Sequence, residues 1–505
     1  MDTLNSRTAL SVVRHWIAGT HHAGTGERTG DIFDPATGEV TKQVAFASAA
    51  DLDAAVDAAT TAFDSWRHST LAQRAKVLFA FREACVERQG ELAEIITSEH
   101  GKTLEDAAGE IARGLEVVEF ACGIPHLLKG GFSEGVSQGV DVYSIRQPVG
   151  PVAIISPFNF PAMVPCWFFP IAIAAGNTVV LKPSERDPSA AVWFAERWAD
   201  AGLPSGVFNV LHGDKTAVNG LIEHPAIKAI SFVGSTPVAR MVYETGTRNG
   251  KRVQALGGAK NHMVVLADAD LQQAANSAVS AGFGSAGERC MAISVIVVVD
   301  EVADALVAEI VARISTLRVG DGRRGFDMGP LVTKDHLARV SSYVERGASE
   351  GAELVVDGRG VTVDGAAEGF WLGPTLFDHV SPEMSIYTDE IFGPVLSIVR
   401  VASYDAALEL VNANPYGNGA AIFTGDGFAA RRFQNEVEVG MVGINVPIPV
   451  PVSYYSFGGW KNSLFGDTNA HGTEGIHFFT RGKVVTSRWP ESSHHGLEYA
   501  FPQNA

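Results

Sequence analysis

Residues 151–182 read PVAIISPFNFPAMVPCWFFPIAIAAGNTVVLK. Two short apolar runs, at 152–155 and 178–181, flank a helix-sized apolar run at 162–175, which predicts a strand, a buried helix and a second strand. No charged residue occurs between Arg146 and Lys182, but prolines recur throughout this stretch. Their missing N–H groups suit a buried strand–loop–helix better than a membrane span.

The same alternation continues on both sides of this unit. Helical patterns fill residues 51–127, and the capped start of the first helix is expected at Asp51. The elements predicted after residue 182 are a helix at 189–201, strands at 207–211 and 229–233 and, after Gly258, a strand at 263–266, a helix ending near 281, a strand at 293–299 and a helix at 302–317. This pattern predicts an α/β protein with two doubly wound parallel-sheet domains.

Composition narrows the class of protein. The 505 residues are 46% hydrophobic and 19% charged, which excludes a disordered or fibrous chain. A formal net charge of −18 disfavours nucleic acid and anionic lipid as partners. The four cysteines have no C-x-x-C spacing, so we expect a reducing compartment with neither a disulfide framework nor a bound metal.

Two glycine-rich stretches, GFGSAG at 282–287 and GDGRRG at 320–325, match the G-x-G-x-x-G pattern of dinucleotide-binding turns. That pattern needs a strand before it and a helix after it. The first stretch follows a helix-like segment, and the second runs into Pro330. We therefore expect neither stretch to hold a pyrophosphate.

Cys290 is the candidate nucleophile. Cys85, Cys122 and Cys166 are interpreted as small buried residues, whereas Cys290 follows a glycine-rich turn and stands beside Arg289. Both features are expected to favour the thiolate. A nucleophile that attacks a carbonyl also needs donors for the developing oxyanion, and Asn159, a polar amide in an apolar loop, is the candidate, although alone it is typical of a turn.

Five motifs together resemble the aldehyde dehydrogenase superfamily. They occur in the family's order, and the resemblance extends from about His15 to Arg488. The motifs are PFNFP at 157–161, LKPSE at 181–185, FVGST at 232–236, the Cys290 loop and EIFGPV at 390–395.

The resemblance implies an aldehyde dehydrogenase-like architecture with two doubly wound domains and a β oligomerisation extension. The implied divisions are an NAD-binding domain at 1–132 and 148–258, a catalytic domain at 259–475, bridging segments at 133–147 and 476–490, and a flexible tail at 491–505. It also implies a homotetramer, built as a dimer of dimers, although the sequence does not distinguish a dimer from a tetramer. A cytoplasmic location is expected, because few residues precede the family-like start at His15.

The family's chemistry assigns roles to these residues. Cys290 is expected to attack an aldehyde, Asn159 and the Cys290 N–H to stabilise the oxyanion, and hydride transfer to NAD to leave a thioester. A carboxylate at Glu185 repels a 2′-phosphate, so NAD is favoured over NADP. The implied cofactor residues are Ser156, Phe158, Lys182, Glu185, Arg186, Ser235, Gly257, Glu390 and Phe392.

One departure from the family bears on the reaction. Most members carry a glutamate in an E-L-G-G-K stretch that activates water, but here the stretch reads VQALGGAKNH at 253–262, with Ala255 or Leu256 at that position. No acidic residue occurs between Glu244 and Asp268. Loss of a general base typically costs roughly 10²–10⁴-fold in the step it serves, so we expect coenzyme A rather than water to release the acyl group.

Three further stretches, 101–114, 287–292 and 445–451, resemble the CoA-acylating methylmalonate-semialdehyde dehydrogenase branch. There, Arg113 and Arg289 match arginines that bind the substrate carboxylate, which is the bidentate pairing that guanidinium groups favour. The implied reaction oxidises methylmalonate or malonate semialdehyde, releases CO₂ and yields propionyl-CoA or acetyl-CoA, as in valine or inositol breakdown. The alternative for Arg113 is a surface salt bridge with Glu110 or Glu116, and for Arg289 a role in tuning the thiolate or stabilising its loop.

Three other functions are alternatives to the CoA-acylating reaction. A hydrolytic aldehyde dehydrogenase with a displaced base is the nearest alternative. A thiolase also uses cysteine and CoA, but no cysteine here lies in a C-x-G loop and the chain lacks duplicated halves. A silent structural homologue is disfavoured because Cys290, Asn159, Lys182 and Glu390 are all present. The preferred semialdehyde and the CoA docking site stay open.

Overall fold

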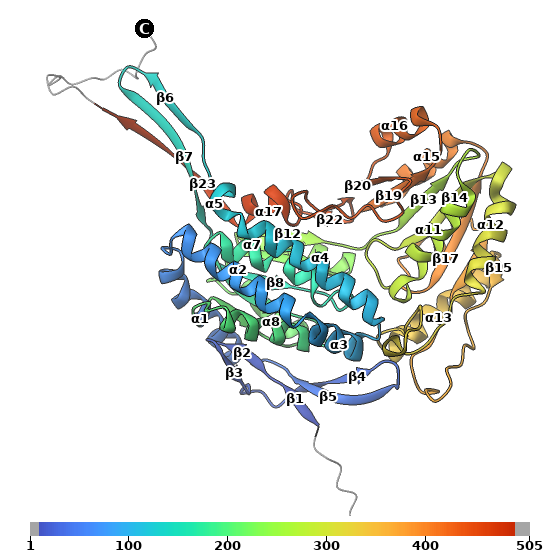
Figure 1. Ribbon diagram of the computed structural model, residues 1–505, viewed down its shortest axis with the longest axis horizontal. Coiled ribbons are helices and arrows are strands. Elements are labelled where there is room, and N and C mark those ends of the chain that lie inside the picture. Colours follow the sequence, from blue (N-terminus) through green and yellow to red (C-terminus); the bar gives the residue numbers. More distant parts are fainter. Residues whose placement is uncertain (1–9, 490–505) are drawn as a thin grey trace, which may run out of the picture.

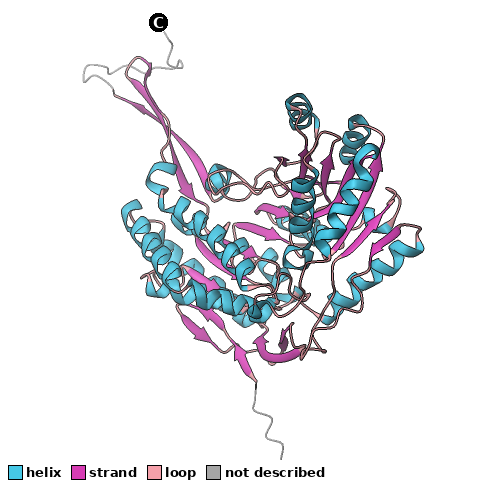
Figure 2. Ribbon diagram, turned by 45° about the vertical axis from the view of Figure 1, so that its right-hand side comes forward, coloured by secondary structure: helices cyan, strands magenta, loops and turns pink. Residues whose placement is uncertain are grey.

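Two large sheets form the centre of the computed structural model, which describes residues 10–489 (Figure 1). The predicted tail at 491–505 and residues 1–9 and 490 lie outside the described residues. Helices lie against both sheets (Figure 2), so the predicted α/β class with two doubly wound parallel sheets is confirmed.

The first sheet has eight strands, and those at its centre are parallel. Its order is β22 (Leu464–Phe465), β12 (Arg252–Leu256), β11 (Ala229–Val233), β8 (Pro151–Ile155), β9 (Thr178–Lys182), β10 (Phe208–Val210), β2 (His15–Ile17) and β3 (Thr20–His22). Every residue of β8, β9 and β11 is buried, because helices cover both faces of the sheet. Residues 464–465 join this sheet although they fall within the range 259–475 expected for the second domain.

The second sheet has seven strands, all parallel except the edge strand β15. Its order is β15 (Glu353–Val356), β16 (Thr375–Asp378), β17 (Val395–Val401), β14 (Ile293–Val299), β13 (Asn261–Val265), β19 (Gly419–Phe423) and β20 (Met441–Ile444). The smaller sheets contain β1 (Ser11–Val13), β5 (Glu39–Ala45) and β4 (Thr29–Asp34), and the pair β18 (Tyr416–Gly417) and β21 (Trp460–Lys461).

The helices follow the predicted alternation. Those before residue 259 are α1 (Ala49–Trp66), α2 (Leu71–Glu87), α3 (Gln89–His100), α4 (Leu104–Cys122), α5 (Ile124–Leu127), α6 (Met163–Cys166), α7 (Phe169–Ala174), α8 (Ser189–Asp200), α9 (Lys215–Glu223) and α10 (Thr236–Arg248). Those after it are α11 (Leu271–Phe283), α12 (Asp300–Ile314), α13 (Lys334–Ser349), α14 (Ser385–Thr388), α15 (Tyr404–Ala413), α16 (Gly427–Glu436) and α17 (Gly472–Phe478). Among the helices of residues 10–489, none is both long enough and apolar enough to cross a bilayer.

Two local details differ from the sequence prediction. Helix α1 begins at Ala49 rather than Asp51, because Ser48 is the N-cap and Asp51 completes a capping box with it. The apolar run at 162–175 is divided into α6 and α7, and Pro170, which has no N–H to donate, lies in the first turn of α7.

Neither glycine-rich stretch forms a strand–turn–helix, as expected. Residues 282–287 lie at the end of α11 and in the 3₁₀ turn Gly284–Gly287, and residues 320–325 surround a second 3₁₀ turn at Gly322–Arg324.

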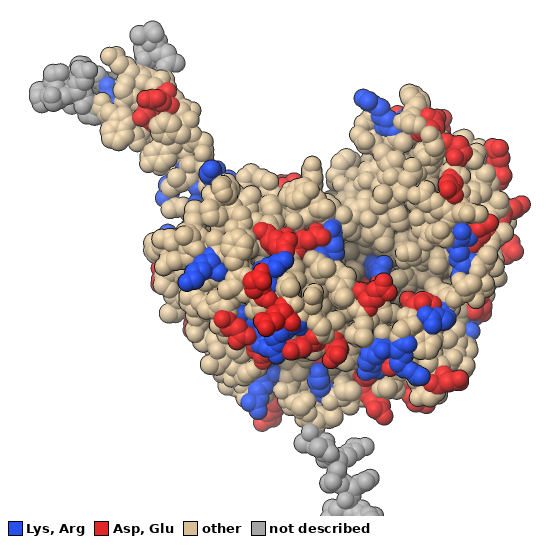
Figure 3. All heavy atoms as spheres, viewed as in Figure 1, with Lys and Arg blue, Asp and Glu red and all other residues tan. Residues whose placement is uncertain are grey.

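A three-stranded sheet projects from the body (Figure 1, upper left) and contains β6 (Phe132–Ser137), β7 (Val140–Pro148) and β23 (Thr480–Arg488). Strand β23 pairs antiparallel with β7 from Thr480–Pro148 to Arg488–Val140. Both segments expected to form the bridging extension, 133–147 and 476–490, therefore contribute strands to one sheet, although β23 begins only after α17. Acidic and basic side chains are interspersed over the face shown in Figure 3.

Asn177 connects this extension to the first sheet. Its fully buried amide accepts hydrogen bonds from the N–H groups of Val149 (2.8 Å) and Gly150 (3.1 Å). It donates to the carbonyls of Ala172 (3.0 Å) and Phe479 (2.9 Å). One side chain thus satisfies backbone groups from α7, the start of β8 and the start of β23.

We predict that Asn177→Ala lowers the free energy of unfolding by about 2–4 kcal/mol, because each buried backbone group left without a partner costs about 1–3 kcal/mol. Denaturant unfolding followed by far-UV circular dichroism measures the change. Asn249→Ala is the matched control, since that exposed amide bonds only to the Thr245 carbonyl, and it is expected to cost less than about 1 kcal/mol. Equal losses in the two variants would contradict the prediction.

Candidate active site

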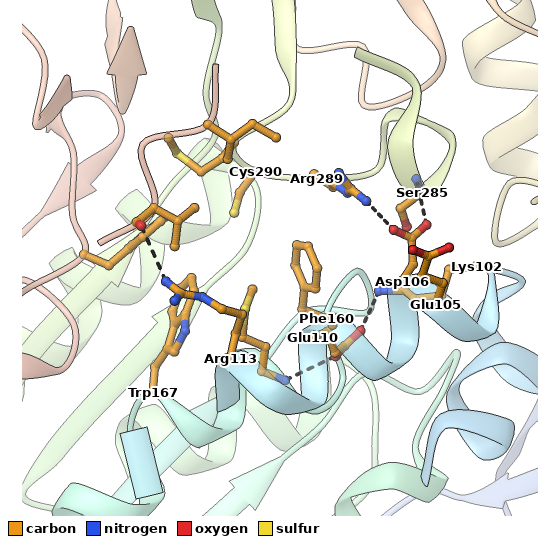
Figure 4. Close-up of a pocket in the computed structure, with 16 residues that line it drawn as sticks. Lys102, Glu105, Asp106, Glu110, Arg113, Phe160, Trp167, Ser285, Arg289 and Cys290 are labelled. Atoms are coloured by element: carbon orange, nitrogen blue, oxygen red, sulfur yellow. Dashed lines mark hydrogen bonds and ion pairs between the residues drawn. The ribbon is translucent and has the colours of Figure 1, made fainter. Parts of the chain in front are cut away.

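Two cavities meet at Cys290. One cavity, of about 270 Å³, contains both predicted substrate arginines and is called the arginine cavity (Figure 4); it is lined by Lys102, Glu105, Asp106, Gly109, Glu110, Arg113, Phe160, Met163, Trp167, Ser285, Arg289, Cys290, Met291, Ile448, Val450 and Phe457. The other, of about 410 Å³, is called the glycine cavity; it is lined by Pro157, Phe158, Asn159, Arg186, Val233, Gly234, Ser235, Gly257, Gly258, Cys290, His336, Arg339, Glu390 and Phe392. Within residues 10–489, Cys290 alone lines both.

The backbone around Cys290 is tightly fixed. In the preceding 3₁₀ turn, Ser285 and Ala286 both adopt φ of 52°, a left-handed conformation that non-glycine residues rarely hold without support. The carbonyl of Cys290 accepts hydrogen bonds from the amides of Asn261 (2.9 Å) and Asn418 (3.1 Å). Both asparagines belong to the second sheet region and were missed in the sequence, where each reads as an ordinary polar residue.

The surroundings of Cys290 favour the neutral thiol. Burial, and after it the charge of Glu390, raises its pKa to about 12, although its own N–H, that of Met291 and the charge of Arg289 act in the opposite direction. The expected effect of Arg289 on the thiol is present, since its charge lowers this pKa, but burial outweighs it. The Arg289 guanidinium is also paired with the carboxylate of Asp106.

Asn159 lies in the loop between β8 and α6 and is buried, with its side chain in the wall of the glycine cavity. Its main-chain carbonyl accepts a hydrogen bond from Lys102 Nζ at 2.7 Å. Its side-chain amide makes no hydrogen bond to any other described residue, so both N–H groups are available to a ligand. The structure thus places the predicted nucleophile and the predicted oxyanion donor on one cavity.

Both predicted substrate arginines lie in the arginine cavity, and each is already paired with a carboxylate on α4. Figure 4 shows the pair of Arg289 with Asp106. Arg113 Nη1 donates to both Glu116 oxygens (2.9 and 2.7 Å), and its Nη2 donates to the Pro451 carbonyl (2.8 Å). The alternative interpretation of Arg113 is thus partly correct, since the salt bridge with Glu116 exists and coincides with a cavity position. Its other proposed partner, Glu110, pairs with Lys102 instead.

Three of the carboxylates that line the two cavities have partners. In the arginine cavity, Asp106 is bound to Arg289 and Glu110 to Lys102. In the glycine cavity, Glu390 Oε1 accepts from the Ala259 N–H at 2.8 Å, and burial raises its pKa. The position that carries the family's base lies in β12, where Ala255 and Leu256 are buried.

The predicted cofactor residues divide into two groups. Phe158, Arg186, Ser235, Gly257, Glu390 and Phe392 line the glycine cavity. Ser156, Lys182 and Glu185 adjoin it without lining it, and Lys182 Nζ pairs with Glu185 at 3.0 Å. Ser235 is the N-cap of α10, yet its hydroxyl makes no capping bond. The N–H groups of the first turn therefore have no side-chain cap and are available to a ligand.

An aromatic and basic wall closes the same cavity. The Arg186 guanidinium lies 4.7 Å from the centre of the Phe158 ring, and the Phe158 and Phe392 rings meet edge to face at 5.8 Å. His336 and Arg339, from α13, complete the wall and were not found from the sequence, because they belong to none of the quoted motifs. Burial lowers the pKa of His336 to about 4, so its neutral ring donates from Nε2 to the Phe392 carbonyl at 2.7 Å.

A dinucleotide fits the features of the glycine cavity. Gly258 lacks a side chain where one would lie 2.4 Å from Glu390 Oε2, so the backbone and Glu390 pack closely at the cavity wall. The hydroxyl of Ser156, next to the cavity residue Pro157 in the chain, is buried and has no partner among the described residues. Over residues 10–489, no group of three or more His, Cys, Asp or Glu side chains is placed to hold a metal ion.

The fold and the position of Cys290 at the junction of two cavities agree with the family that the motifs indicate. The model of the aldehyde dehydrogenase family matches residues 21–485, and the chain belongs to that family. A malonate-semialdehyde dehydrogenase of Pseudomonas aeruginosa is 55% identical over 98% of this chain and 100% of its own length.

Two solved structures resemble the fold over nearly its whole length. A methylmalonate-semialdehyde dehydrogenase of Oceanimonas doudoroffii is 50% identical with a TM-score of 0.94, covering 96% of this chain and 99% of that one. A Sinorhizobium meliloti 1021 protein, assigned as a methylmalonate-semialdehyde dehydrogenase and complexed with NAD, is 53% identical with a TM-score of 0.95, covering 96% of this chain and 100% of that one. The resemblance stated from the motifs is confirmed.

We predict that alkylation of Cys290 by iodoacetamide accelerates about tenfold per pH unit from pH 7 to 10 without a plateau, because the thiolate fraction rises in that way below a pKa near 12. Glu390→Gln removes a charge that raises this pKa, so it should speed alkylation at pH 8. Mass spectrometry of the labelled protein measures the rate, with Cys290→Ser as the blank for the three buried cysteines. A plateau below pH 9 would contradict the assignment.

Proposed function

We propose that this protein oxidises malonate or methylmalonate semialdehyde with NAD, holds the acyl group as a thioester on Cys290 and passes it to CoA after loss of CO₂. The observation that carries the proposal is the position of Cys290, where the arginine cavity and the glycine cavity meet. The names of the similar proteins, malonate- and methylmalonate-semialdehyde dehydrogenases, support the same substrate class.

The glycine cavity is the proposed NAD site. The α10 N-terminus at Ser235 would hold the pyrophosphate, Lys182 and Glu185 the adenine-ribose hydroxyls, and Glu390 the nicotinamide ribose. Ser156, Phe158, Arg186, Gly257 and Phe392 would line the same site. NAD, when bound, supplies the hydride acceptor, and the NAD complex of the similar Sinorhizobium meliloti protein supports this choice.

The arginine cavity is the proposed substrate site. Arg113 and Arg289 both offer guanidinium groups to the cavity, and Met163, Trp167 and Phe457 make part of its wall apolar. A short semialdehyde with one carboxylate matches this division, because its charge can pair with arginine and its carbon chain can lie against the apolar wall. The pairing of each arginine with a carboxylate on α4 holds the guanidinium groups in place before the substrate arrives.

The chemistry follows from these positions. The Cys290 thiol gives its proton to solvent as the sulfur adds to the aldehyde carbon, and the Asn159 amide and the Cys290 N–H stabilise the oxygen that becomes negative. After hydride leaves the carbon, the acyl group is a thioester whose carboxylate is β to the carbonyl. Cleavage of that C–C bond releases CO₂ and moves the electron pair into an enolate, which the same donors stabilise until it is protonated.

The last step separates the proposal from the hydrolytic alternative. Neither Ala255 nor Leu256 can activate water, so a thiol is the better acceptor of the acyl group. Glu390 is the specific observation that favours the alternative, because its carboxylate shares the glycine cavity with the sulfur and its pKa is raised by burial.

We propose a homotetramer in which the β6–β7–β23 sheet bridges subunits. Phe132 and Val484, on this extension, are 66% and 71% exposed, which is unusual for large apolar side chains outside an interface. The domain divisions expected from the sequence, 1–132 with 148–258 and 259–475, fit the two large sheets apart from β22. Four free cysteines suit a reducing, cytoplasmic setting.

We predict that malonate semialdehyde and NAD give a single-turnover burst of NADH whose steady-state rate then depends on CoA. Stopped-flow absorbance at 340 nm with and without CoA measures it, and adding CoA should raise the steady-state rate at least tenfold. The product should be acetyl-CoA by mass spectrometry. A steady-state rate that CoA leaves unchanged, and that Glu390→Gln abolishes without weakening NAD binding, would establish hydrolysis with Glu390 as the base.

We also predict that Arg113→Met lowers kcat/KM for malonate semialdehyde by about 10- to 100-fold and leaves propanal within about threefold. A hydrogen bond to a charged group is worth about 1.5–3 kcal/mol, and only the charged substrate loses it. Arg82→Met is the control, since Arg82 also pairs with glutamates on helices but lines neither cavity. Equal losses on the two aldehydes would show that Arg113 only supports the structure.

A further inference from the structure

The loop that carries Asn159 is held by a buried ion pair that the proposed mechanism does not use. Lys102 lies between α3 and α4, and Glu110 lies on α4. Both side chains are completely buried, and Lys102 Nζ donates to Glu110 Oε2 at 2.6 Å (Figure 4). Neither residue was singled out for this role by the sequence, where they are only part of the stretch 101–114.

The ion pair forms hydrogen bonds with both ends of the Asn159 loop. Lys102 Nζ also donates to the main-chain carbonyl of Asn159 at 2.7 Å. Glu110 Oε1, the oxygen not bound to Lys102, accepts from the N–H groups of Ala162 (2.8 Å) and Met163 (3.2 Å), where α6 begins. A chain of hydrogen bonds thus runs from Asn159 through the two charged groups to residues three and four positions further on.

A third contact fixes the middle of the loop. The Lys102 ammonium lies 4.3 Å from the centre of the Phe160 ring, within the range of a cation–π interaction. Phe160 follows Asn159 directly in the chain. The same Lys102 ammonium therefore contacts both residues, the first through its carbonyl and the second through its ring. The Asn159 side chain itself is left without a bond to the rest of the described chain.

The energetics indicate that this arrangement does more than fill space. Removing two charges from water is costly, and an apolar pair of similar volume is often as stable as a buried ion pair. What an apolar pair cannot do is bind a carbonyl and two N–H groups of one loop in a fixed direction. The charges therefore serve the geometry of the loop.

We propose that Lys102 and Glu110 are positioning residues that aim the Asn159 amide at the oxygen of an acyl group on Cys290. The inference rests on the role of Asn159 in the proposed function and extends it to two residues that act through this loop and whose side chains are completely buried. Without the ion pair, the side-chain amide of Asn159 is no longer held in this orientation. An oxyanion donor that is displaced acts much like one that is removed.

Two thiol reagents separate positioning from general damage. p-Nitrophenyl acetate acylates a thiol through a tetrahedral intermediate with a negative oxygen, so its reaction needs the oxyanion donors. Iodoacetamide alkylates a thiol by direct displacement at carbon and forms no such oxygen. Neither reagent requires NAD, semialdehyde or CoA, so the comparison tests the loop alone in the intact protein.

We expect Lys102→Met to slow acylation of Cys290 by p-nitrophenyl acetate about 10- to 100-fold and to change iodoacetamide alkylation less than threefold. Lys102→Met/Glu110→Gln, which leaves no unpaired charge but keeps an acceptor for the Ala162 N–H, should show the same selective loss. Lys42→Met removes another lysine–glutamate pair, with Glu99, whose members line neither cavity, and should change neither rate. Parallel losses with both reagents would overturn the proposal.

A double-substitution cycle with Asn159 completes the test. If Lys102 acts through Asn159, Lys102→Met/Asn159→Ala should be within twofold of Asn159→Ala alone. Multiplied losses would overturn the positioning role and leave the role of Asn159 intact. Unchanged acylation in Asn159→Ala would overturn both the oxyanion role and the inference built on it, while a slow Asn159→Ala beside an unaffected Lys102→Met would overturn the inference alone.

Discussion

The position of the partly buried Cys290 thiol between two cavities is the constraint on which the rest of the site depends. In the proposed reaction an aldehyde reaches the sulfur from one side and a hydride acceptor from the other, and the walls of both cavities converge on it. Such convergence removes water, and the same desolvation that raises the pKa of the thiol strengthens every dipole aimed at an oxyanion nearby. Asn261 and Asn418, from separate segments of the chain, fix the backbone here by donating hydrogen bonds to the Cys290 carbonyl.

Helix α4 organises the arginine cavity from the other side. Asp106, Glu110 and Arg113 are spaced four and three residues apart, so they lie along one face of the helix. Asp106 holds Arg289, Glu110 holds the Asn159 loop through Lys102, and Arg113 projects into the cavity itself. The Thr103 N-cap, whose hydroxyl accepts from the Asp106 N–H, fixes where this face begins. Helix α4 therefore contacts both proposed substrate arginines and, through Lys102, the loop of the proposed oxyanion donor.

The sequence was sufficient where local pattern and tertiary demand agree. The apolar runs at 152–155 and 178–181 became fully buried parallel strands, and the motifs placed Asn159, Cys290 and Glu390 around one cavity. It was insufficient where a side chain had several partners to choose from. Arg289, beside Cys290 in the chain, does lower the pKa of the thiol, but the larger effect of burial and the pairing of its guanidinium with Asp106 depend on distant parts of the chain. His336 and Arg339 reach the cavity only because α13 packs there, and no local pattern records that.

The fate of the acyl group depends on which nucleophile can approach it, and the two carboxylate positions are not equivalent. A base at residue 255 or 256 would start from β12, but this chain has only buried apolar side chains there. Glu390 remains, and its carboxylate lies against the Gly258–Ala259 backbone, bound to one N–H and close enough to Gly258 to exclude a side chain. A carboxylate held in this way is suited to orient a ribose, because its oxygens already have fixed directions. Its bond to the Ala259 N–H is consistent with the proposal that a thiol, rather than water activated by Glu390, accepts the acyl group.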